Sequence, residues 1–133
     1  MKISEKEILR YLGYHNIKAD HAITQTIRKL LPTLMDYSTP KYVCGKWNIE
    51  INNSKVKLEG LTIDSIGLSK HIADCNQIIL FGATLGSKID RYIKKLSASG
   101  NMQKALIADT ICNCMIEAYC DEIQVELMKD SPI

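Results

Sequence analysis

Residues 68–93, LSKHIADCNQIILFGATLGSKIDRYI, constrain the fold more than any other part of this 133-residue chain. The run from Ile78 to Ala83 is apolar except for a glycine. Such a run has no face suited to water, so it predicts a strand that is covered on both sides. Ser87 is then placed to cap the helix that follows. The loop at Thr84–Ser87 therefore lies where backbone N–H groups could meet a ligand.

Apolar residues at helical spacing predict helices on either side of this strand. Ser4 and Glu7 form a capping box before a short helix that ends at Gly13. Asp20 can cap a second helix, in which Pro32 removes a backbone donor, so we expect a kink or a break near the residue that precedes it. Further helices are predicted over residues 65–75, 87–98 and 101–129.

Between the second and third helices the apolar period changes from 3.6 to 2. Apolar and polar residues alternate over 46–51, turn residues occupy 52–54, and the alternation resumes over 56–58, which predicts a β-hairpin. Gly60 ends this hairpin, and a short strand is expected near 61–63. These elements predict an α+β fold with helices packed on a small, mainly antiparallel sheet, in a single domain over residues 1–133.

Composition excludes some classes of partner. The chain has 17 basic and 15 acidic residues, a net charge of +2, and its charges are scattered along the sequence. This distribution lacks the electrostatic footprint of a nucleic-acid-binding protein, so we expect no nucleic-acid partner. No run of about 18 apolar residues occurs, so we expect no membrane association and a cytoplasmic location.

The five cysteines predict free thiols rather than disulfides or a metal site. Their number is odd, no Cys-x-x-Cys pair occurs, and no secretory signal precedes them. Cys112, Cys114 and Cys120 lie on one predicted helix, but at about 100° per residue they point in different directions and cannot close on a single ion. An independent enzyme that uses Cys112 or His71 is the weakest of the functional hypotheses.

The loop formed by Thr84, Leu85 and Gly86 has two interpretations. A helix N-terminus behind a strand offers partial positive charge and unpaired N–H donors, which suit a carboxylate or a phosphate. Alternatively, Gly82 and Gly86 only allow the chain to turn sharply between strand and helix. The loop lacks a Gly-x-Gly-x-x-Gly or Gly-Lys-Ser/Thr pattern, so the structural interpretation is favoured.

The long C-terminal helix carries two acidic residues beside an apolar face. Asp109 and Glu117 are eight residues apart and share roughly one face. An acid beside an apolar seam is usually a solvated edge residue. The apolar residues of this seam are Ile107, Ile111, Met115, Ala118 and Tyr119.

Three segments together resemble a known family. EILRYLGY at 7–14, the stretch at 68–93 and ALIADTICNCMIEAYCDEI at 105–123 resemble the reactivation, or S-adenosylmethionine-binding, domain of cobalamin-dependent methionine synthase. The likeness is greatest to the small stand-alone form of that domain. It implies a methionine synthase activation-domain-like fold, and a glutamate at Glu117 facing the S-adenosylmethionine pocket. The expected cofactor-binding residues are Thr84, Leu85, Gly86, Asp109 and Glu117.

One family motif is missing from residues 1–133. In the family, an Arg-x-Ser/Ala-Pro-Gly-Tyr segment after the long helix grips S-adenosylmethionine, whereas this sequence reads MKDSPI there. The chain is therefore expected to match the N-terminal and central parts of the domain, and to bind S-adenosylmethionine weakly or not at all.

The resemblance implies a role in the repair of methionine synthase. The chain would be an accessory subunit, rather than an independent enzyme, that supports reductive methylation of cob(II)alamin by S-adenosylmethionine. The partner would be a cobalamin-dependent methionine synthase or a related corrinoid protein that carries the cobalamin, with flavodoxin as electron donor. We also expect a homodimer, or a tight complex with the partner, through the seam at Ile111, Met115, Ala118 and Tyr119. The alternative is a non-catalytic interaction or assembly protein that keeps the fold and has lost cofactor binding.

Overall fold

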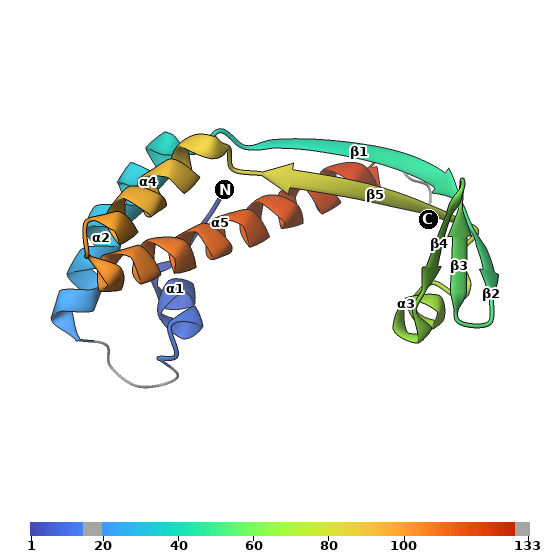
Figure 1. Cartoon of the computed structure of the whole chain (residues 1–133), viewed down its shortest axis with the longest axis horizontal. Helices are drawn as coiled ribbons and strands as arrows, with labels where there is room; N and C mark the ends of the chain where they lie inside the picture. The colour runs from blue at the N-terminus through green and yellow to red at the C-terminus, as the bar shows by residue number, and fades with distance from the viewer. Residues whose placement is uncertain (15–19, 130–133) are drawn as a thin grey trace. The chain divides into compact units, whose positions relative to one another are not determined.

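The computed structural model describes residues 1–14 and 20–129 (Figure 1). In this part of the chain five helices and two small antiparallel sheets confirm the α+β class. The elements are α1 (Glu5–Tyr11), α2 (His21–Tyr37), β1 (Lys41–Asn48), β2 (Glu50–Asn52), β3 (Lys55–Leu58), β4 (Leu61–Asp64), α3 (Ile66–His71), β5 (Gln77–Thr84), α4 (Ser87–Ala98) and α5 (Met102–Lys129).

The chain forms two compact units. Met1–Lys41 and Ala83–Ile133 make up the first, which we call the helical unit, and Tyr42–Gly82 make up the second, the sheet unit. The expectation of a single domain over 1–133 stays a prediction. None of the helices among the described residues combines the length and the apolar character needed to cross a bilayer.

The first two helices of the helical unit begin at the predicted caps. The Ser4 hydroxyl accepts a hydrogen bond from the Glu7 backbone N–H at 3.1 Å, and the Asp20 carboxylate accepts one from the Ala22 N–H at 3.2 Å. Each cap satisfies a donor that the first turn of a helix leaves without a partner.

Pro32 does not break α2, so of the two predicted outcomes the break is wrong and the kink stays a prediction. The helix continues through Pro32 to Tyr37. Leu30 and Leu34, on either side of the proline, are both buried in the core and hold the two halves in place. Pro32 and Arg28 are exposed, so water can solvate the Arg28 carbonyl that the proline leaves without a donor.

The core of the helical unit surrounds α5, which packs against α1, α2 and α4. Ile111 and Met115 of α5 are fully buried in this core. The expectation that Ile111 and Met115 lie on an exposed seam is therefore wrong, because the chain's own helices already cover them. Ala118 and Tyr119 are partly exposed, and the homodimer or complex stays a prediction. Their fully buried partners on the other helices are Ile8, Ile27, Leu30, Leu34 and Ile89.

The sheet unit contains the predicted hairpin and the short strand after it. β2 and β3 pair in register Asn52↔Lys55 across a two-residue turn, and Asn53 takes a positive φ of 58° there. β3 also pairs with β4, across a turn in which Gly60 has a φ of 81°. α3 packs on β3, and Val56 is fully buried beneath it.

The strand predicted from the apolar run forms, but it is not covered on both sides. β5 pairs with β1 in a two-stranded sheet of the described residues. Ile79, Leu80 and Phe81 of β5 expose 37%, 46% and 36% of their surface, and Val43 of β1 exposes 76%. An apolar run indicates that its side chains favour burial, but it does not specify what covers them, so the prediction of burial is wrong for this chain.

Candidate functional site

The loop between β5 and α4 is held by its own hydrogen bonds and by the core. Leu85 is buried in the helical core, and its carbonyl accepts a hydrogen bond from the Thr39 backbone N–H at 2.7 Å. The Gly86 N–H donates to the Thr84 hydroxyl at 3.0 Å. These internal partners leave Leu85 and the Gly86 amide poorly placed to bind a ligand, which supports the structural interpretation of the loop.

Gly86, not Ser87, caps α4, so the predicted cap is wrong by one residue. Gly86 has a φ of 95°, in the left-handed region that a glycine enters at little cost. A Cβ at this position would lie 3.3 Å from the Thr39 Cβ, so space as well as conformation favours glycine. Because a glycine has no side-chain acceptor, the first turn of α4 has no side-chain cap, and its N–H donors stay open to solvent or a ligand.

Asp109 and Glu117 are both exposed on α5, as expected for acids at the edge of an apolar face. Each acts electrostatically on a nearby thiol, Asp109 on Cys112 and Glu117 on Cys120. Among the described residues, no hydrogen bond or ion pair joins either carboxylate to the loop before α4. The structure therefore places all five predicted residues in the helical unit, but it does not link the two groups by a direct polar contact.

The buried thiols do not have the properties of a nucleophile. Burial, together with the charges of Asp109 and Asp90, raises the pKa of Cys112 from 9.0 to about 12, so this thiol is protonated at neutral pH. Burial also raises the pKa of Cys114. Within residues 1–14 and 20–129, no group of three or more His, Cys, Asp and Glu side chains is arranged to hold a metal ion.

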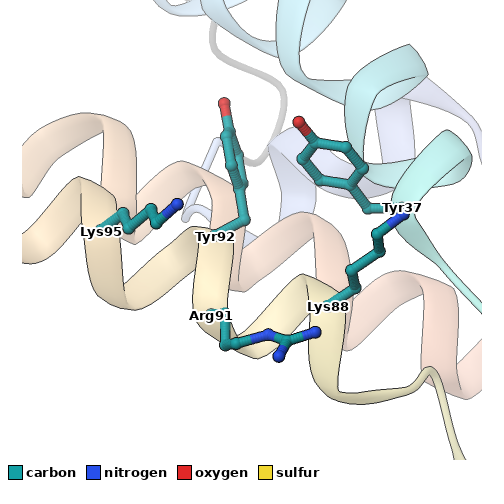
Figure 2. A pocket seen from close by; sticks show the side chains of 5 residues that line it. All are labelled: Tyr37, Lys88, Arg91, Tyr92 and Lys95. Carbon is teal, nitrogen blue, oxygen red and sulfur yellow. The ribbon is translucent and has the colours of Figure 1, made fainter.

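A pocket of about 520 Å³ lies where the end of α2 meets α4, within the helical unit (Figure 2). We call it the tyrosine–cation pocket, and it was not anticipated from the sequence. Tyr92 and three cations come from α4, and Tyr37 is the last residue of α2. The full lining consists of Tyr37, Lys88, Arg91, Tyr92 and Lys95.

The two tyrosines give this pocket a fixed wall. The rings of Tyr37 and Tyr92 meet edge to face, with their centroids 5.2 Å apart and their planes at 70°. Both rings pack partly against the helical core. The Lys88 ammonium nitrogen lies 5.7 Å from the centre of the Tyr37 ring, within the range of a cation–π contact.

The spacing of the cations was visible in the sequence, but their partner was not. Lys88, Arg91 and Lys95 recur at intervals of three and four residues, which places them on one face of the helix predicted over 87–98. Tyr37 comes from a segment far away in the sequence, and only the fold brings it to this face. The expectation that basic residues are merely scattered is thus wrong for α4.

Comparison with known proteins adds no assignment. No protein-family model matches the chain, and no curated protein matches it in sequence.

Proposed function

We propose that this chain is a reactivation module, or accessory subunit, for a cobalamin-dependent methionine synthase or a related corrinoid methyltransferase. It would have a methionine synthase activation-domain-like fold and act in the cytoplasm on a partner that carries the cobalamin. Its contribution would be to position S-adenosylmethionine and the partner for reductive methylation of cob(II)alamin, with flavodoxin as the electron donor.

The observation that carries this proposal is the resemblance of residues 7–14, 68–93 and 105–123 to that family. In the structure these segments cover most of α1, the end of α3, β5 with the loop after it, the first part of α4 and most of α5. An α+β arrangement of helices and small antiparallel sheets is compatible with such a domain. The burial and raised pKa of the Cys112 thiol are also compatible, because a reactivation module leaves the reacting atoms to its cofactors.

The chemistry of S-adenosylmethionine fits groups that the helical unit presents. The cofactor carries a carboxylate together with cationic ammonium and sulfonium groups, and it supplies the methyl group when bound. The open N–H donors in the first turn of α4 suit the carboxylate. The exposed carboxylate of Glu117 suits a cationic group, and Asp109 lies two helical turns away on the same helix.

A second candidate is a non-catalytic interaction or assembly protein that keeps the fold without binding the cofactor. The specific observation in its favour is the exposed apolar surface of β5 and β1, to which Ile79, Leu80, Phe81 and Val43 contribute. The internal hydrogen bonds of the loop at Thr84–Gly86 also suit this alternative.

A reactivation assay separates the two functions. The chain is added to a cobalamin-dependent methionine synthase that lacks its own reactivation domain and holds cob(II)alamin. Reduced flavodoxin and S-adenosylmethionine are then supplied, and the cob(II)alamin absorbance is followed. The proposal predicts loss of cob(II)alamin only when the chain and S-adenosylmethionine are both present.

Glu117→Gln and Asp121→Asn form a matched pair for this assay. Both residues are exposed on α5 and each substitution removes one negative charge. Glu117→Gln should slow reactivation by about tenfold, the usual loss for one charge-assisted contact, whereas Asp121→Asn should leave it unchanged. If the chain binds the methyltransferase but gives no reactivation under any condition, the interaction-protein function replaces the proposal.

A further inference from the structure

We propose that the tyrosine–cation pocket binds a small phosphorylated ligand that carries a planar ring, of the nucleoside mono- or diphosphate class. Its lining side chains are not among the residues expected to hold S-adenosylmethionine, although Lys88 lies in the first turn of α4, beside the N–H groups proposed for the carboxylate of that cofactor. This site does not depend on the proposed reactivation function, because it rests on the geometry and charge of α4 and Tyr37 alone.

The pocket concentrates positive charge that the rest of the chain does not balance. α4 carries four basic residues and one acidic residue, and therefore a net charge of +3, in a chain whose total net charge is only +2. Among the described residues, Lys88, Arg91 and Lys95 form no ion pair. Their acidic helix neighbour, Asp90, acts on Cys112 and does not line the pocket.

This arrangement has an energetic cost that a bound anion would remove. Like charges three and four residues apart on a helix repel each other, so Arg91 opposes both Lys88 and Lys95. An anion between them would replace repulsion by attraction. The ammonium groups suit phosphate as point charges, and the planar guanidinium suits it as a two-pronged donor.

The tyrosines indicate that the ligand carries more than phosphate. Figure 2 shows Tyr37 and Tyr92 side by side above the cationic side chains of α4. Their edge-to-face contact holds the rings in place before a ligand arrives, so ordering them on binding costs little. A volume of about 520 Å³ exceeds what inorganic phosphate needs and lies in the usual range for small organic ligands.

The same features argue against S-adenosylmethionine as the occupant. That cofactor bears two cationic groups and one carboxylate at neutral pH, so three cations would repel it overall. A nucleoside diphosphate has the opposite charge and combines a planar ring with phosphate groups. S-adenosylmethionine therefore serves as a negative control, a ligand that should not bind in this pocket.

Calorimetric titration of the 133-residue chain with ADP, pyrophosphate, adenosine and S-adenosylmethionine tests the assignment at low ionic strength. We expect ADP to bind most tightly, with pyrophosphate and adenosine each at least about tenfold weaker, because each keeps only half of the contacts. S-adenosylmethionine should not displace ADP. Pyrophosphate binding as tight as that of ADP, or no ADP binding at about 1 mM, would overturn the proposal.

Arg91→Gln and Lys94→Gln provide the matched comparison. Both positions are exposed on α4 and each substitution removes one positive charge, but only Arg91 lines the pocket. Arg91→Gln should weaken ADP binding by at least about tenfold, and Lys94→Gln by less than about twofold. Circular dichroism should give the same helical signal for both variants.

Two results would contradict this site. An equal loss of affinity for ADP in the two variants would mean that ADP binding depends only on the net charge of α4. A single-stranded oligonucleotide that binds more tightly than ADP, and loses its binding in Arg91→Gln, would assign the pocket to nucleic acid instead.

Discussion

Replacement of Met115 by alanine should strongly destabilise the helical unit. Met115 is 0% exposed, in the middle of α5, in a core to which α1, α2 and α4 contribute. Truncation of a fully buried methionine to alanine costs about 2–5 kcal/mol, because the transfer free energy of the removed atoms is lost and a cavity remains. We expect about 3 kcal/mol here, a large part of the total stability of a small protein.

Urea denaturation followed by far-ultraviolet circular dichroism measures this loss, since most of the helical signal comes from the helical unit. With an m-value of about 1–3 kcal/mol/M, the midpoint should fall by about 1–3 M urea. Met128→Ala is the matched control, because Met128 lies on the same helix and is 51% exposed. Its effect should stay within about 0.5 kcal/mol.

Two outcomes would refute this reasoning. Equal midpoints for the Met115 and Met128 variants would mean that the middle of α5 is not enclosed by the other helices. A Met115→Ala protein that keeps its stability but changes from dimer to monomer in sedimentation would show that Met115 lies at a dimer interface and not in a closed core.

The remaining predictions concern a thiol, a turn and a cap. Cys112 is buried and its pKa is raised to about 12, so it should react with a thiol reagent at neutral pH far more slowly than the exposed Cys44. Peptide mapping of the labelled protein measures the two rates, and similar rates would contradict the burial of Cys112. The folded state holds the Cys112 proton more tightly than the unfolded chain does, because the pKa is higher in the folded state. The contribution of this thiol to stability is therefore complete below pH 9.0 and should decline as the pH rises toward about 12, which a fall in the urea midpoint would show. Gly86→Ala should lower the free energy of unfolding by at least about 1 kcal/mol because of its positive φ, whereas Gly82→Ala, with open space around it, should not. Asp20→Ala should cost about 0.5–2 kcal/mol in the same denaturation assay through loss of the α2 cap, and an unchanged midpoint would mean that the cap contributes nothing.

Local chemistry explains the parts of the fold that the sequence predicted well. Ser4 and Asp20 cap their helices with their own side chains, and the turn at Asn53 is specified by residues next to it. The bounds of α4 at 87–98 follow from its apolar period and from Gly100, which has a positive φ of 82° just beyond the helix. Each of these signals lies within a few residues of its effect.

Apart from the cap of α4, the failed predictions required knowledge of which surfaces pack against each other. Met115 and the residues of β5 are similarly apolar, yet Met115 is enclosed and Leu80 is exposed. Pro32 sits in an unbroken helix because buried leucines flank it. The tyrosine–cation pocket needs Tyr37 to meet α4 from another helix. A short window of sequence does not show which distant segments will pack against each other.

The central claim, that this chain acts on a corrinoid methyltransferase, is tested most directly by binding to the partner in two oxidation states. Calorimetry should measure the affinity of this chain for a methionine synthase that lacks its own reactivation domain, first in the cob(II)alamin form and then in the methylcobalamin form. A module that engages the inactive enzyme and leaves it after repair is expected to bind the inactive conformation more tightly than the repaired one. We predict a complex with the cob(II)alamin form at least about tenfold tighter than with the methylcobalamin form. Failure to bind either form would contradict the proposed function, and equal affinity for both would contradict a role in reactivation.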